Sequence, residues 1–119
     1  MSWGLDQTPV YVGVLRLVLR VPGARSRKDR RQAVQSLADR MRHRFDLSVN
    51  EIDRGEQPTM AVLVATTAGN DGRLIRSILD QASGFARSVG SVVATGIDVD
   101  VFRWHAPGVE ALNLEYDDG

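Results

Sequence analysis

The sequence predicts a single α+β domain in which a strand, a helix, two strands, a second helix and a last strand follow one another. Alternating or continuous apolar residues of β-rich type indicate the four strands, and apolar residues three and four positions apart indicate the two helices. The order βαββαβ is that of the ferredoxin-like plan. We therefore expect a four-stranded antiparallel sheet with two helices on one face, and the length of 119 residues fits one such domain.

The first predicted strand, residues 10–21, has two different faces. One face is apolar and is expected to meet the helices: Tyr11, Leu15, Leu17, Leu19 and Val21, with Gly13 among them. The other face is expected to stay open and carries Val12, Val14 and Val18 beside Arg16 and Arg20. An open apolar face usually needs a partner, so we expect Val12, Val14 and Val18 to form the interface of a homo-oligomer, most simply a dimer.

The first predicted helix runs from Ser26 to about residue 45. Ser26 and Asp29 have the spacing of a capping box, with Asp in place of the commoner Glu. Arg27, Lys28 and further cations fill the first two turns, where positive charge opposes the helix dipole. This unfavourable placement indicates that an anion binds there.

The remaining elements follow from similar patterns. Residues 47–53 are predicted to form a short strand, residues 60–67 a central apolar strand, residues 69–72 a turn, the following residues to about 89 a helix, and residues 92–103 the last strand. We assign residues 1–9 to a flexible N-terminus, residues 10–103 to the ferredoxin-like domain, and residues 104–119 to an acidic C-terminal tail.

Charge is balanced in total but uneven along the chain. Ten of the fifteen basic residues lie between Arg16 and Arg44, whereas residues 97–119 hold six acids and only Arg103 as a base. The basic segment favours an anionic partner, although the acidic tail from Glu110 to Asp118 could cover it. The chain has no cysteine, no apolar signal core at its N-terminus and no apolar run near the ~20 residues of a membrane span, so we expect a cytoplasmic protein.

The sharpest candidate site is a composite anion site. We expect the first and third strands to be central and parallel, so that the loops after them lie side by side at two helix N-termini. Phosphates of RNA fit such a site, although the same residues also fit plain caps, turns and a solvated helix face. The site would comprise Gly23, Arg25, Ser26, Arg27, Lys28, Arg30, Arg31, Gly69, Asn70 and Arg73.

Three segments resemble the YlxP family of small bacterial proteins of poorly defined function. They are residues 12–31 with their Pro-Gly-Ala-Arg-Ser turn, residues 44–53 (RFDLSVNEID), and Gly69-Asn70-Asp71. The resemblance implies a ferredoxin-like fold that is commonly oligomeric. It also implies a role near RNA or the small ribosomal subunit, because family members are often encoded among transcription-termination and ribosome-assembly genes. This chain departs from the family pattern at Arg27, where leucine is usual, and in its longer, more acidic tail.

The sequence contains no residue pattern typical of a catalytic triad, a nucleophile elbow, a phosphate-binding Gly-Lys loop or a metal site. We therefore expect no enzymatic activity, no cofactor and no metal. Asp98 and Asp100 share one side of a strand but fit a solvated edge better than a metal or acid–base pair. His43 and His105 are isolated, and few aromatics are present to stack bases. The favoured function is RNA or ribosome binding through the basic helix. The alternative is a homo-oligomeric structural or regulatory module that binds at most a small anion.

Overall fold

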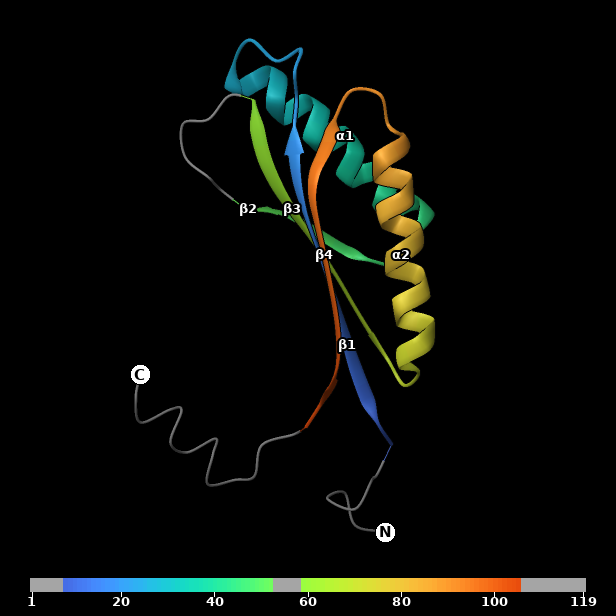
Figure 1. Ribbon diagram of the computed structural model, residues 1–119. Helices are drawn as coiled ribbons and strands as arrows, with labels where there is room; N and C mark the ends of the chain where they lie inside the picture. Colours follow the sequence, from blue (N-terminus) through green and yellow to red (C-terminus); the bar gives the residue numbers. More distant parts are fainter. Residues whose placement is uncertain (1–7, 53–58, 106–119) are drawn as a thin grey trace, which may run out of the picture.

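The computed structural model describes residues 8–52 and 59–105, which form one sheet and two helices (Figure 1). The predicted flexible N-terminus and acidic tail lie almost wholly outside the described residues. The elements are β1 (Val10–Arg20), α1 (Arg27–Arg44), β2 (Ser48–Ile52), β3 (Met60–Gly69), α2 (Gly72–Ser88) and β4 (Val93–Trp104).

The sheet has the strand order β2-β3-β1-β4, and every neighbouring pair is antiparallel. Both helices cover the same face, so the predicted ferredoxin-like fold is confirmed (Figure 1). The expectation that the first and third strands are parallel is wrong. β1 and β3 are indeed central, but Tyr11 pairs with Gly69 and Arg20 pairs with Met60, so the two strands run in opposite directions.

The core lies between the sheet and the helices. Leu15, Leu17 and Leu19 of β1 are fully buried, as the alternation predicts, and each contributes roughly 1.5–3 kcal/mol by leaving water. From the helices the largest fully buried side chains are Val34, Leu37, Met41 and Leu79. The predicted division of β1 into a buried and an open face is therefore confirmed, because Val12, Val14 and Val18 remain only half-buried.

The helix ends differ in one respect from expectation. Ser26 caps α1, and its Oγ accepts a hydrogen bond from the Asp29 N–H at 3.1 Å, as predicted. The alternative reading of the sequence makes Asn70 a plain cap of the second helix, but Asp71 takes that role because its carboxylate accepts hydrogen bonds from the N–H groups of Arg73 and Leu74. β4 extends to Trp104, one residue into the predicted tail.

Gly13 lets α2 pack directly against β1. A Cβ at this position would overlap the Ile75 side chain and lie 2.7 Å from Leu79 Cδ1. We expect Gly13→Ala to lower the unfolding free energy by about 1–3 kcal/mol in urea denaturation, because both neighbours are core residues of a packed helix.

Gly84, in the middle of α2, provides the matched control. A Cβ there meets no atom within 4 Å, so Gly84→Ala should raise stability by about 0.5–1 kcal/mol through helix propensity alone. Equal effects of the two substitutions would contradict the packing described for Gly13.

Candidate functional site

The two halves of the predicted composite site lie at opposite ends of the sheet. In the antiparallel register Gly69 is opposite Tyr11 at the start of β1, whereas Gly23 follows the other end of β1. Ten residues of extended chain separate these ends by roughly 33 Å. Gly69, Asn70 and Arg73 therefore cannot bind the same phosphate as the loop before α1, and the composite site is wrong.

The N-terminus of α2 already holds an anion of its own. The Asp71 carboxylate accepts hydrogen bonds from Arg73 N at 3.0 Å and Leu74 N at 3.3 Å. A shallow depression of about 640 Å³ adjoins this turn, between Tyr11, Asn70 and Arg73. An external phosphate would have to displace or approach the Asp71 carboxylate, which makes this half a poor anion site.

The first turns of α1 retain the predicted basic surface. Arg25, Arg27, Lys28 and Arg31 are all exposed. A shallow groove of about 440 Å³ is lined by three of these cations and two glutamines: Arg27, Lys28, Arg31, Gln32 and Gln35. We call these five residues the α1 basic groove. Its described lining holds three cations and no acid.

Asp29, the acid in the first turn of α1, is engaged in the helix cap. Its Oδ2 accepts the backbone N–H of Arg25 at 3.1 Å, while its own N–H donates to Ser26 Oγ. This reciprocal arrangement fixes the turn that contains Gly23 and Ser26. The cap thus accounts for Ser26 and Asp29, but it does not account for the cations beside them.

Arg30 is not part of the basic surface, contrary to the sequence-based assignment. Its side chain is 4% exposed and lies under the helix, where its guanidinium is 3.8 Å from Glu51 and donates to the Met60 carbonyl at 3.4 Å. Helical geometry explains the difference, since residue 30 shares the inward stripe with Val34 and Leu37. Arg30 joins α1 to β2 and β3 instead of facing a ligand.

The face of the sheet opposite the helices is open and partly apolar. Val12, Val14 and Val18 lie on it, as predicted. The sequence analysis missed two aromatics beside them: Phe102 and Trp104 of β4 are 42% and 48% exposed. Their two-residue spacing and their pairing with Val12 and Val10 place both on this face. Phe102 lies within the predicted last strand, where alternation with Val101 and Arg103 could have placed it on the open face, and extending that strand by one residue would have added Trp104.

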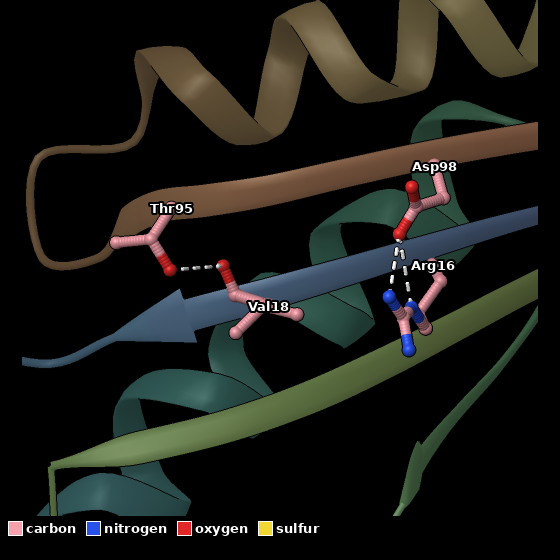
Figure 2. Close-up of polar contacts among 4 residues, drawn as sticks. All are labelled: Arg16, Val18, Thr95 and Asp98. Carbon is pink, nitrogen blue, oxygen red and sulfur yellow. Dashed lines mark hydrogen bonds and ion pairs between the residues drawn. The ribbon is translucent and has the colours of Figure 1, made fainter.

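Asp98 forms an ion pair on the same open face. Arg16 Nη2 and Nε donate to Asp98 Oδ2 at 2.7 and 3.0 Å, across the β1–β4 pair (Figure 2). Both side chains are more than half exposed, so the pair is worth at most about 1 kcal/mol. Figure 2 also shows Thr95 Oγ1 donating to the Val18 carbonyl at the irregularity of this strand pair.

No group of three or more metal-ligating side chains gathers within residues 8–52 and 59–105. None of the helices there is long and apolar enough to cross a membrane. The described part of the site therefore consists of the α1 basic groove, a capped α2 N-terminus and an open sheet face.

Comparisons with known proteins identify a family but no activity. No curated protein matches the chain. Among solved structures, a de novo designed protein, Foldit4, is similar with a TM-score of 0.45 and 9% identity, over 82% of this chain and 99% of that one. A family model described as a protein of unknown function (DUF503) matches residues 12–99. Because this match spans the whole sheet and both helices except the strand ends, the chain belongs to the DUF503 family.

Proposed function

We propose that this protein is a non-enzymatic, cytoplasmic RNA-binding protein that contacts structured RNA through the α1 basic groove. One observation carries the proposal: three exposed cations, Arg27, Lys28 and Arg31, gather at the helix end where positive charge is unfavourable. A phosphate backbone offsets that cost, and releasing its counterions supplies binding free energy.

The geometry favours contacts to the RNA backbone. Arg27 and Arg31 are four residues apart and share one flank of α1, with Gln35 one turn further. Arginine forks and glutamine amides donate to phosphate and ribose oxygens. The resemblance to the YlxP family supports the small ribosomal subunit as the source of this RNA.

Charge reversal tests the groove. The triple variant Arg27→Glu, Lys28→Glu, Arg31→Glu should lose at least tenfold in affinity for a structured RNA at low salt, measured by filter binding. The plot of log affinity against log salt should also become less steep by about two to three units, because three phosphate contacts are lost.

The matched control moves the same charge change to α2. Arg73→Glu, Arg76→Glu, Arg87→Glu alters three exposed arginines on the other helix and should retain most of the affinity. No binding by the unmodified protein at low salt, or equal losses in both triple variants, would refute the proposal.

Arg30 and Arg31 provide a second, adjacent comparison. Arg30→Ala should lower the unfolding free energy by about 1–3 kcal/mol, because a buried side chain and its contact with Glu51 are lost. Arg31→Ala should change stability by less than about 0.5 kcal/mol but weaken RNA binding. The opposite pattern, with Arg30→Ala fully stable and defective in binding, would contradict the burial of Arg30.

A second candidate function is a homo-oligomeric structural or regulatory module without a nucleic-acid role. The exposure of Phe102 and Trp104 beside Val12 and Val14 on the open sheet face favours it. Such apolar surface is costly in water and is typical of a protein interface. Since the open face and the α1 basic groove lie on opposite sides of the sheet, one chain could use both.

If the protein is a dimer, analytical ultracentrifugation at high micromolar concentration should show a species with twice the mass of one chain. Val14→Asp should convert it to a monomer, because a second carboxylate would then lie opposite Asp100 on the open face. The matched substitution Gln35→Asp, on the helix side, should leave the mass unchanged. A monomeric unmodified chain at that concentration would exclude this function.

A further inference from the structure

A second basic groove lies between the C-terminal parts of α1 and α2, away from the α1 basic groove. It has a volume of about 630 Å³ and is walled by Arg40, His43 and Arg44 of α1 and by Phe85 and Ser88 of α2. Figure 1 shows the end of α1 passing close to the last turns of α2 at this point. The groove is open to solvent, like the α1 basic groove, and its volume would admit a small organic ligand.

Arg44 is held in a defined position in this groove. The carbon at the centre of its guanidinium lies 5.0 Å from the centroid of the Phe85 ring. Phe45 makes an edge-type contact with the same ring, with centroids 6.1 Å apart and planes at 67°. The edge contact supports the Phe85 ring, and the cation–π contact holds the guanidinium over that ring.

The groove therefore presents a planar cationic surface. The Arg44 guanidinium carbon lies over the Phe85 ring, and because Arg44 is exposed, the side of the guanidinium away from the ring is accessible to a ligand. Guanidinium planes are surfaces on which unpaired RNA bases stack. Since Phe85 backs the guanidinium, a base there would complete a three-layer stack of base, guanidinium and phenyl ring.

The charges around this plane favour an anion. Arg40 is one helical turn before Arg44 and lines the same groove. The one acid in the described lining is Asp39. It forms an ion pair with Arg42, in which Asp39 Oδ1 accepts a hydrogen bond from Arg42 Nη1 at 2.7 Å. The negative charge of Asp39 is thereby compensated, which leaves Arg40 and Arg44 to act on a ligand.

We propose that this groove binds one unpaired nucleotide of RNA, with its base stacked on Arg44 and its phosphate held by Arg40. The proposal rests on the RNA-binding function above and extends it. The α1 basic groove contacts backbone phosphates, and the groove between the helices takes a single extruded nucleotide. Arg31 and Arg44 are separated by about 20 Å along α1, so one RNA can reach both.

An NMR titration of the full chain with adenosine 5′-monophosphate tests the site directly. Amide resonances of residues 40–44 and 85–90 should shift, with affinity at least fivefold above that for inorganic phosphate or adenosine alone. Equal affinity for phosphate would show a simple anion site and overturn the proposal, as would shifts confined to residues 27–35.

Two lysine substitutions separate stacking from charge. Arg44→Lys keeps the charge but removes the plane, so it should weaken nucleotide binding about fivefold or more. Arg76→Lys, at an exposed position of α2 that lines neither groove, should leave nucleotide binding unchanged. Wild-type affinity in Arg44→Lys would overturn the stacked arrangement.

A further experiment with RNA hairpins distinguishes a nucleotide within RNA from a free nucleotide. A hairpin with a single-nucleotide bulge should bind more tightly than the fully paired hairpin, and Arg44→Lys should abolish the difference. Nucleotide binding in the groove without any affinity for either hairpin would refute the RNA-binding function and leave a free-nucleotide site. Hairpin binding without preference for the bulge would instead refute only the extruded nucleotide.

Discussion

β1 forms hydrogen-bonded ladders along both of its edges, with β3 on one side and β4 on the other, and this antiparallel pairing places every other element. Its leucines at positions 15, 17 and 19 bury one face against the helices. Because the two central strands run in opposite directions, the helices begin at opposite ends of the sheet. The direction of this pairing therefore decides which loops can share a ligand.

The two helix N-termini, which lie at opposite ends of the sheet, differ in their charged groups. α2 begins with its own carboxylate cap, Asp71, whereas α1 begins with a cap whose only acid, Asp29, is occupied by the Arg25 amide. Helix N-termini attract anions, but a carboxylate already in place lowers that attraction. For this reason the proposed anion-binding surface lies at α1, where exposed cations supplement the helix end.

α1 carries its cations on two flanks with different surroundings. Arg27, Lys28 and Arg31 line an open groove with glutamines, whereas Arg40 and Arg44 face α2 and its phenylalanine. The first flank suits the delocalised charge of a nucleic-acid backbone. The second combines charge with a flat surface, and such a combination discriminates a nucleotide from a bare phosphate.

The sequence alone determined the element order, the faces of β1 and the cap of α1, because these depend on residue periodicity and on contacts within four residues. Tertiary structure decided the remainder. The antiparallel register separated Gly69 from Gly23. The rotation of α1 buried Arg30 against Glu51, and the approach of the two helices brought Arg44 over Phe85, residues 41 positions apart in the chain. Such contacts depend on how elements pack together, and local residue patterns carry no information about that packing.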